Sequence, residues 1–211
     1  MLKGYDTSHH QTDKVFNVYL EIADFMIIKA TEGKTYVDPK FRQRAEQITD
    51  RLCGFYHYAR PDNNTIHEEV DNFVEVITPY LNSDCLLFLD WERESLNHPF
   101  TWAVEWCQIV EDLTGIKPII YASASTIQKY KDKYNLWWTA HYNDDCERGC
   151  NHDGVKEVLT QYTSKPLDCD VFHGAINDWK RLSGNDPIMS TEVIATWKDD
   201  NYCYEVIRHG I

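Results

Sequence analysis

The chain has 211 residues, a length that corresponds to one domain with at most a short appendage. Its 34 acidic residues exceed its 21 basic residues, so the formal net charge is −13. This charge argues against nucleic acid and anionic membranes as partners, because both attract cationic surfaces. The hydrophobic share of 43% is enough for a normal core and excludes disorder as the main state.

Cysteine usage and hydropathy indicate the compartment. Seven cysteines cannot form a fully paired disulfide framework. Cys85 and Cys107 lie in apolar patterns that predict burial, where a reduced thiol behaves as a small hydrophobe and not as a nucleophile. No stretch reaches the run of about 18 apolar residues that a membrane-spanning helix needs, and no signal peptide is recognisable. We therefore expect synthesis in a reducing cytoplasm, unless a leader has been removed.

Short apolar runs bounded by turn residues predict buried strands. After a first strand that ends near Asp6, they lie at residues 25–30, 54–59, 86–90, 118–122 and 136–142. Helical patterns lie between them: after Asp38-Pro39 up to Leu52, after Thr65, from Pro99 to a stop at Gly115, and from Ser125 to Tyr134. Thr65 and Glu68 have the spacing of a capping box. This alternation predicts parallel strands joined by right-handed crossovers.

Two observations favour a barrel over a doubly wound sheet. The first strand is followed by an acid and hydroxyl residues and not by a glycine-rich phosphate-binding turn. Other acids also fall at predicted strand ends, where a β/α barrel gathers its active site. After Tyr142 the helical signal fades, and residues 158–162 and 169–172 look like strands joined by loops. The prediction is an α/β fold, an irregular TIM-like barrel that lacks some of its later helices.

The composition shifts near Asp186-Pro187. Residues 190–197 have helical spacing, and a second short helical pattern runs from residue 202 to residue 208. We therefore predict a catalytic barrel over residues 1–184 and a short helical C-terminal appendage over residues 185–211. The appendage is too small to fold alone.

The principal candidate site is the end of an apolar strand, Leu89-Asp90-Trp91-Glu92. The period of two in a strand puts the carboxyl groups of Asp90 and Glu92 on one face. Two close carboxyls can hold different protonation states, which suits a general acid with a charged neighbour. A solvated strand end is the alternative interpretation.

Further acids and aromatic residues fall at other strand ends. Asp6 follows the first strand, and Asp168 and Asp170 flank Cys169; each could instead be a cap or a turn former. If these ends meet at one barrel mouth, carboxyl groups and rings line it together. The ring-bearing candidates are Tyr56, Tyr58, Trp91, Tyr121, Trp138, His141 and Tyr142. Rings that stack on sugars beside proton-transferring acids are what a sugar-cleaving site needs.

Six motifs now stand in order along the chain: Gly4-Tyr5-Asp6-Thr7-Ser8-His9-His10-Gln11, Ile27-Ile28-Lys29-Ala30-Thr31-Glu32-Gly33, Tyr56-His57-Tyr58-Ala59-Arg60-Pro61, Leu89-Asp90-Trp91-Glu92, Pro118-Ile119-Ile120-Tyr121-Ala122-Ser123 and Trp138-Thr139-Ala140-His141-Tyr142. With them, residues 1–180 resemble glycoside hydrolase family 25, the lysozymes of Chalaropsis type. The resemblance implies an N-acetylmuramidase that hydrolyses the β-1,4 bond between N-acetylmuramic acid and N-acetylglucosamine in peptidoglycan. It implies an irregular β/α barrel and no cofactor.

The resemblance also implies roles for the acids. Glu92 matches the general acid that protonates the glycosidic oxygen. Asp90 matches its partner, which either steers the substrate's N-acetyl group as nucleophile or assists water. Asp6 and Asp168 match the other acids of the site. The expected protein is a monomeric phage endolysin, made in the host cytoplasm and acting on the wall after release, or an autolysin.

The chain departs from the family pattern in its later part. Asp170 stands where the late motif has asparagine, and Thr160 stands where tryptophan usually precedes Gln161-Tyr162. The tail from residue 192 to residue 197 resembles the start of a short cell-wall-binding repeat of some phage lysozymes, without its third helix. A plain packing helix is the alternative.

Other readings of the sequence remain open. A carbohydrate-binding barrel without turnover would keep the cleft, although the intact Asp90 and Glu92 speak against it. A chitinase-type site would need acids where Phe88 and Cys85 stand. Three possible zinc ligands, Cys146, Cys150 and His152, lack a standard spacing and an evident fourth ligand, so no metal site is predicted. The spacing of the acids does not decide between retention, inversion and substrate assistance.

Overall fold

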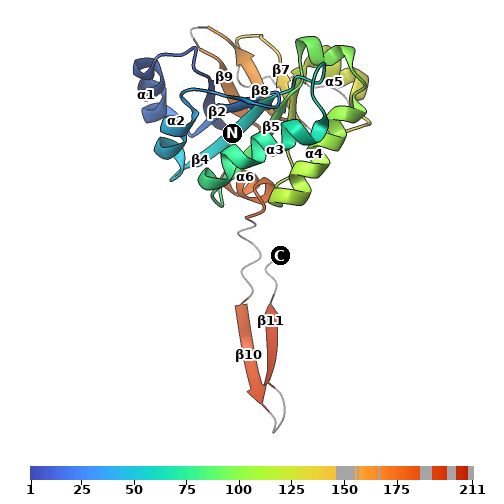
Figure 1. Ribbon diagram of the computed structural model, residues 1–211. Coiled ribbons are helices and arrows are strands. Elements are labelled where there is room, and N and C mark those ends of the chain that lie inside the picture. Colours follow the sequence, from blue (N-terminus) through green and yellow to red (C-terminus); the bar gives the residue numbers. More distant parts are fainter. Residues whose placement is uncertain (146–154, 156, 166, 186–191, 199–202, 209–211) are drawn as a thin grey trace.

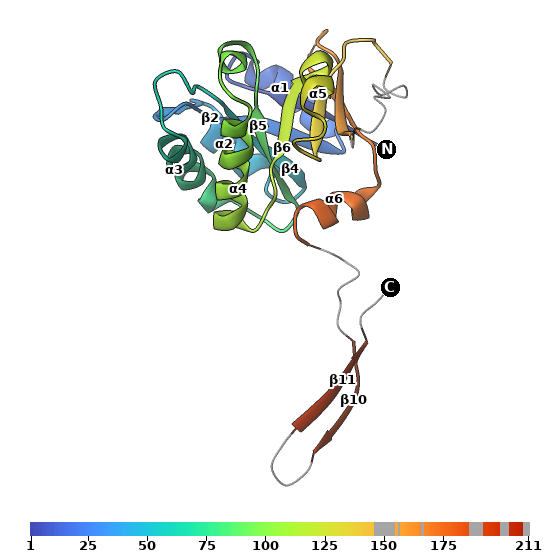
Figure 2. The ribbon, with the colours of Figure 1, turned by 90° about the vertical axis from the view of Figure 1, so that its right-hand side faces the viewer.

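A closed barrel forms the body of the molecule (Figures 1 and 2). The computed structural model describes residues 1–145, 155, 157–165 and 167–185, and the backbone of 192–198 and 203–208. The barrel strands are β1 (Leu2–Thr7), β2 (Phe25–Glu32), β4 (Leu52–Tyr58), β5 (Cys85–Asp90), β6 (Ile119–Ser123), β7 (Trp137–Ala140), β8 (Glu157–Thr163) and β9 (Cys169–Phe172). A short strand, β3 (Tyr36–Val37), pairs with the end of β2. The predicted irregular β/α barrel is confirmed.

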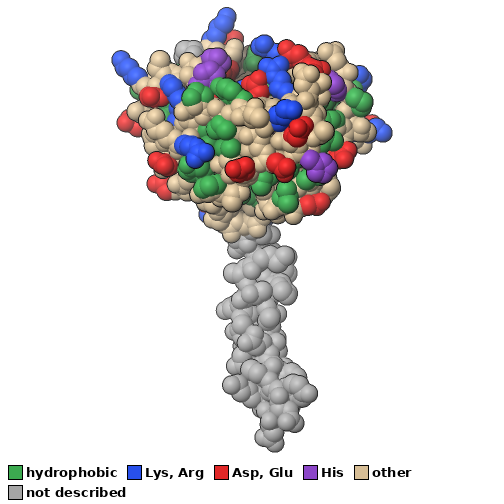
Figure 3. Space-filling model, in the orientation of Figure 1, with side chains coloured by type: hydrophobic (Ala, Val, Ile, Leu, Met, Phe, Trp, Pro, Cys, Tyr) green, Lys and Arg blue, Asp and Glu red, His purple; other side chains and the backbone are tan. Residues whose placement is uncertain are grey.

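Helices pack around the strands, and acidic and basic side chains are interspersed on the face seen in Figure 3. The helices are α1 (Asp13–Ile22), α2 (Phe41–Ile48), α3 (Ile66–Ile77), α4 (Thr101–Thr114), α5 (Ala124–Tyr130) and α6 (Ile176–Leu182), with 3₁₀ turns η1 (Thr78–Tyr80) and η2 (Arg93–Asn97). Within the described residues, no helix is long and apolar enough to cross a membrane.

The barrel closes through one antiparallel strand. Each barrel strand from β1 to β7 pairs in parallel with the next barrel strand, whereas β9 pairs antiparallel with both β8 and β1. Only residues 164–168 connect β8 to β9, too few for the crossover that a parallel pair requires. Because β9 is reversed, its first residues lie at the end of the barrel where the parallel strands finish. Cys169 pairs with Tyr5, and Asp170 pairs with Gln161.

Alternation along the strands divides core residues from cleft residues. Gly54 faces the interior, since a Cβ atom there would lie 2.5 Å from the Phe88 ring and 3.2 Å from Ile27. Two residues further along each strand, Lys29, Tyr56 and Asp90 line a cavity. The strand period of two therefore gives an apolar barrel interior with a polar layer at its carboxyl end.

The clearest helix signals of the sequence hold in the structure. Thr65 Oγ1 accepts a hydrogen bond from Glu68 N at 3.3 Å, and Thr65 N donates to Glu68 Oε2 at 2.9 Å, which completes the capping box of α3. Gly115 ends α4 with φ +74°, a conformation that favours glycine. The sequence patterns did not predict two of the helices, α1 and α6. In α1, Thr12 caps Val15 N at 3.3 Å, a start signal that could have been read.

Helix α6 closes the lower end of the barrel in Figure 1. Its Trp179 is fully buried, and the ring lies 4.8 Å from that of Phe25 and 5.2 Å from that of Phe172. Trp179 Nε1 donates to Asp84 O at 2.8 Å. Helix α6 therefore covers the end of the barrel opposite the polar layer.

The prediction of a helical tail is wrong. Residues 192–198 and 203–208 are strands, β10 (Glu192–Lys198) and β11 (Cys203–Arg208), which pair antiparallel in a sheet of their own with a bulge between residues 193 and 195. Val, Ile, Thr and Trp dominate the first segment, and branched and aromatic residues favour strands. A helical cell-wall-binding repeat does not fit these strands, and the domain boundary at residue 184 stays a prediction.

One buried cation fixes the loop after β1. Arg44 is almost fully buried in α2, and its guanidinium donates to Ser8 O and Gln11 O, both at 2.7 Å. It also lies 4.7 Å from the Phe16 ring and pairs with Asp13 at 3.1 Å. A helix side chain thereby holds loop carbonyls beside two residues that line the cavity.

We expect Arg44→Met to lower the free energy of unfolding by about 1–3 kcal/mol, because a buried carbonyl loses its donor while the apolar packing is kept. Urea unfolding at neutral pH measures the change. The matched control is Arg42→Met on the exposed face of the same helix, which should shift stability by less than about 0.5 kcal/mol. Equal losses in the two variants would contradict the role of Arg44.

Candidate active site

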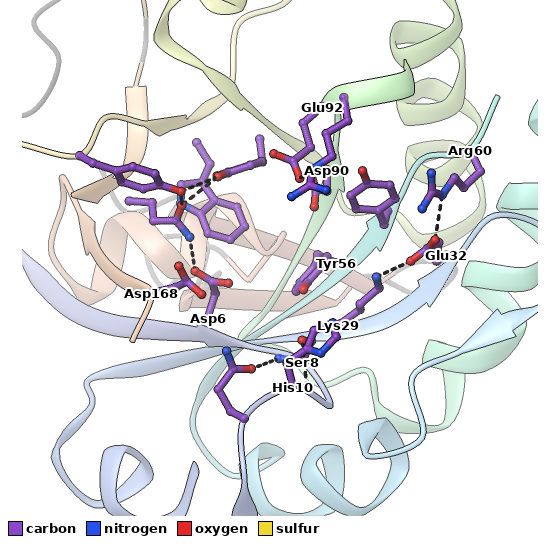
Figure 4. Close-up of a pocket in the computed structure, with 17 residues that line it drawn as sticks. Asp6, Ser8, His10, Lys29, Glu32, Tyr56, Arg60, Asp90, Glu92 and Asp168 are labelled. Atoms are coloured by element: carbon purple, nitrogen blue, oxygen red, sulfur yellow. Dashed lines mark hydrogen bonds and ion pairs between the residues drawn. The ribbon is translucent and has the colours of Figure 1, made fainter. Parts of the chain in front are cut away.

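A cavity of about 420 Å³ opens at the carboxyl end of the parallel strands (Figure 4). Side chains from seven barrel strands and from the connections that follow β1, β4, β5, β7 and β8 line it. They are Asp6, Ser8, His10, Gln11, Lys29, Glu32, Tyr56, Tyr58, Arg60, Asp90, Glu92, Arg93, Tyr121, Trp138, Tyr142, Gln161 and Asp168. All four acids predicted from the sequence, Asp6, Asp90, Glu92 and Asp168, are brought together here.

Asp90 and Glu92 lie side by side on one wall of the cavity (Figure 4). Burial raises the pKa of Asp90, the negative charge of Glu92 raises it further, and Lys29 lowers it. Burial likewise raises the pKa of Glu92, with Arg93 acting in the opposite direction. The Glu92 side chain keeps 35% of its surface exposed, so it can reach a ligand. A carboxyl that holds its proton above the usual range and faces a cleft can serve as a general acid.

Asp6 and Asp168 lie together on the other side of the cavity (Figure 4). Asp6 N donates to Asp168 O at 3.3 Å, which holds the end of β1 against the start of β9. Burial, followed by the charge of Asp168, raises the pKa of Asp6 to about 8. Burial also raises the pKa of Asp168, as does the charge of Glu92. The four acids therefore form two pairs that face the same space.

A glutamine joins the aromatic residues to Asp6. Gln161 Oε1 accepts from the hydroxyl groups of Tyr121 at 2.8 Å and Tyr142 at 2.7 Å, and Gln161 Nε2 donates to Asp6 Oδ2. Trp138 packs edge-on against Tyr121, with ring centroids 4.7 Å apart. These contacts hold the rings of Tyr121 on β6, Trp138 on β7 and Tyr142 after β7 in fixed orientations along the cleft.

Cations line the third side of the cavity and are paired with acids. Lys29 Nζ lies 2.6 Å from Glu32 Oε2 and 4.9 Å from the centre of the Tyr58 ring. Arg60 contacts Glu32 at 2.8 Å and Glu94 at 3.0 Å. The cavity can thus offer guanidinium and ammonium donors to a ligand without a large excess of positive charge.

Two of the predicted ring-bearing residues do not line the cavity. Trp91 is only 1% exposed, and its ring packs against those of Phe100 and Trp102, so it cannot stack on a sugar. Because strand side chains alternate, Trp91 points away from the face shared by Asp90 and Glu92. His141 lies at the end of β7 outside the cavity lining, where its N–H donates to Gln161 O at 3.0 Å. Tyr56, Tyr58, Tyr121, Trp138 and Tyr142 line the cavity as predicted.

Several lining residues were missed as site residues, namely Ser8, His10, Gln11, Lys29, Glu32, Arg60, Arg93 and Gln161. For Lys29 a signal existed: a lysine inside the apolar strand Phe25–Glu32 is costly to bury unless it faces a polar site. Gln161 interrupts an apolar strand in the same way. The residues of the loops carry no periodicity from which their direction could be read.

The structure bears on the predicted burial of the cysteines and on the possible zinc ligands. Cys53, Cys85, Cys107 and Cys169 are buried free cysteines, and burial raises the pKa of Cys107 to about 12. A thiolate is therefore not available at Cys107, as the sequence predicted. Within the described ranges, no group of three His, Cys, Asp or Glu side chains is arranged to hold a metal ion. Cys146, Cys150 and His152 lie outside the described residues.

The fold and the cleft define a class of protein: a β/α barrel whose mouth combines carboxyl groups with aromatic rings, as glycoside hydrolases do. A model of the family described as glycosyl hydrolases family 25 matches residues 5–171. The chain belongs to this family.

Individual relatives are distant. YegX of Escherichia coli K12 is 29% identical over 171 residues, which cover 73% of this chain and 61% of that protein, so the chain spans about three fifths of the length of this relative. The N,O-diacetylmuramidase of Chalaropsis sp is 29% identical over 157 residues, which cover 66% of this chain and 69% of that enzyme. The bacterial lysozyme of Streptomyces coelicolor shares the fold, with a TM-score of 0.71 and 22% identity over 88% of this chain and 98% of that one.

The pairing of Arg93 with Glu92 leads to a first prediction for the site. Arg93 Nε lies 3.4 Å from Glu92 Oε1, and its positive charge lowers the pKa of that carboxyl. We expect Arg93→Met to raise the pKa of Glu92, because a nearby cation favours the ionised form. Carboxyl-carbon NMR titration at low salt measures it, with Arg42→Met as the control for loss of a remote cation. An unchanged or lowered pKa in the Arg93 variant would contradict the pairing.

Proposed function

We propose that this protein is an N-acetylmuramidase, a lysozyme that hydrolyses the β-1,4 bond between N-acetylmuramic acid and N-acetylglucosamine in peptidoglycan. The observation that carries the proposal is the pair Asp90 and Glu92 at the end of β5, opening into a cleft with rings and further acids. Membership of glycosyl hydrolases family 25 and the likeness to a Chalaropsis N,O-diacetylmuramidase support it.

In the proposed mechanism Glu92 is the general acid. Its raised pKa keeps it protonated at a pH where an isolated glutamate is ionised, and proton transfer to the glycosidic oxygen makes the leaving group neutral. As the bond breaks, positive charge develops at the sugar carbon, and those cleft carboxyls that are ionised stabilise it. Asp90 lies beside Glu92 and steers the substrate's N-acetyl group or an attacking water. Asp6 and Asp168 form the opposite wall.

In the proposed recognition of the glycan, the aromatic rings contact sugar rings and the cations contact carboxylates. Tyr142, which is 58% exposed, offers its ring face to a pyranose ring, while Tyr58, Tyr121 and Trp138 line the same cavity with little exposed surface. Lys29, Arg60 and Arg93 line the same cavity and can donate to the carboxylates of muramyl units. We propose that the enzyme acts on the cell wall as a monomer, as an endolysin or autolysin does.

The decisive variant is Glu92→Gln, because a neutral amide cannot donate the proton to the leaving oxygen. We expect hydrolysis of purified peptidoglycan to fall by ~10²-fold or more with folding intact by circular dichroism. The control is Glu105→Gln on the exposed face of α4, which should hydrolyse peptidoglycan like the unchanged protein. If Glu92→Gln kept more than a few per cent of the activity, Glu92 would not be the general acid.

Analysis of the products identifies the bond that is cut. Digestion of purified sacculi should release fragments with N-acetylmuramic acid at the new reducing end, as mass spectrometry after borohydride reduction reveals. N-acetylglucosamine at that end would indicate a glucosaminidase. Binding of sacculi without release of fragments would instead indicate a barrel that binds carbohydrate and does not turn it over.

A further inference from the structure

A buried acid that does not line the cavity lies against two residues that do, Asp6 and Trp138. Asp170 is 0% exposed on β9, and its carboxyl group lies within hydrogen-bonding reach of that of Asp6, which is 8% exposed and lines the cavity. Two carboxylates repel, so a hydrogen bond between two carboxyl groups requires a proton on one of them. The floor of the cleft therefore holds a proton that the proposed mechanism does not use.

The other contacts of the pair indicate where this proton lies. Trp138 Nε1 donates to Asp170 Oδ1 at 2.8 Å, whereas no N–H or hydroxyl donor of the described residues reaches the buried Asp170 Oδ2. Asp6 Oδ2 already accepts from Gln161 Nε2. An ionised Asp170 would leave a charged oxygen buried without a donor, while a protonated Asp170 donates to Asp6. When Asp6 ionises, above its raised pKa, the negative charge of the pair is then carried by the carboxyl with more solvent contact.

We propose that Asp170 is a positioning residue that is protonated in the working enzyme and orients Asp6, Trp138 and, through Asp6, Gln161 in the cleft. This inference rests on the proposed muramidase function for its effect on activity but not for the protonation itself.

The groups around Asp170 favour its neutral form, whichever neighbouring strand they belong to. Asp6 on β1 and Asp168 just before β9 are acids, Trp138 on β7 and Gln161 on β8 are neutral, and the thiol of Cys169 lies next to Asp170 in the chain. None of these groups within the described part of the chain is a cation. Asp6 in turn faces Asp168 and Glu92, so its charge also meets acids. Burial, followed by the charge of Asp6, raises the pKa of Asp170 well above its ordinary range.

A single proton thus connects the groups on both sides of Asp6. The sequence of hydrogen bonds runs from Trp138 to Asp170, from Asp170 to Asp6, and from Gln161 to Asp6, while Tyr121 and Tyr142 donate to Gln161. Loss of the proton would place two charges in contact and remove the donor that holds Asp6. We therefore expect Trp138 and Gln161 to lose their fixed orientation when the pair is fully ionised.

The first test reads the proton directly. In protein labelled with ¹³C at the aspartate carboxyls, we expect an aspartic acid signal at the protonated position at neutral pH that is absent from Asp170→Asn. The control Asp71→Asn, at an exposed position on α3, should leave that signal in place. The proposal is overturned if the signal that disappears with Asp170→Asn at neutral pH has the chemical shift of an ionised carboxylate and not that of a protonated carboxyl. This measurement needs no substrate, so it stands apart from the muramidase proposal.

The second test separates donation of a hydrogen bond from filling of space. Asp170→Leu keeps a similar volume without a donor, whereas Asp170→Asn supplies an N–H to Asp6 and an oxygen to Trp138. We expect kcat/KM on peptidoglycan to fall by ~10-fold or more in the Leu variant and to be largely restored in the Asn variant. Equal activity of the Leu and Asn variants would overturn the positioning role. If the unchanged protein does not hydrolyse peptidoglycan, the muramidase proposal fails, and NMR still decides the protonation of Asp170.

Discussion

The closure of the barrel by an antiparallel last strand is the constraint on which the site depends. The parallel strands deliver Asp6 and Asp90 to one end of the barrel by their direction alone. A parallel β9 would send its first residues to the opposite end. The short connection from β8 forces β9 to run back, so that Asp168 and Asp170 begin the strand beside the end of β1. Two strand directions thus bring the acids to one mouth.

The gathering of so many acids at this mouth has an electrostatic consequence. Desolvation is the largest cause of the raised pKa of Asp6, Asp90, Glu92 and Asp168, and repulsion among the acids adds to it. Individually, each buried carboxyl would destabilise the fold if it were forced to ionise. Collectively, they retain protons in the range where a glycosidase needs a proton donor. The same burial that is costly for stability therefore prepares the chemistry.

Much of the fold followed from the sequence because its signals are local. The alternation of apolar runs with capped helices predicted the strands of the barrel, and the capping box at Thr65 and the stop at Gly115 hold in atomic detail. The pairing of Asp90 and Glu92 needed only the strand period. The same period places Trp91 on the other face, where it is buried, so its assignment to the cleft was an error of sequence reasoning.

The features that the sequence did not predict depend on contacts between residues that lie far apart in the chain or in separate segments. In residues 192–198 the spacing of the apolar positions suits a helix, but the pairing with residues 203–208 selects strands. The contact of Asp170 with Asp6 joins residues far apart in the chain, and only closure of the barrel creates it. The direction of the loop after β1 is fixed by Arg44, a residue of α2 that has no special spacing from Ser8.

The charges of the cleft determine what kind of contact would recognise the proposed peptidoglycan substrate. The chain has a net charge of −13, and muramyl peptides also carry carboxylates, so long-range attraction cannot supply the affinity. Within the cleft, Lys29, Arg60 and Arg93 are each paired with an acid, which reduces their pull on an anion. Affinity must therefore come from stacking and from hydrogen bonds of fixed direction. Such contacts lose strength when a ring or an amide turns by a small angle, so the groups that hold Trp138 and Gln161 in place matter as much as those that touch the sugar.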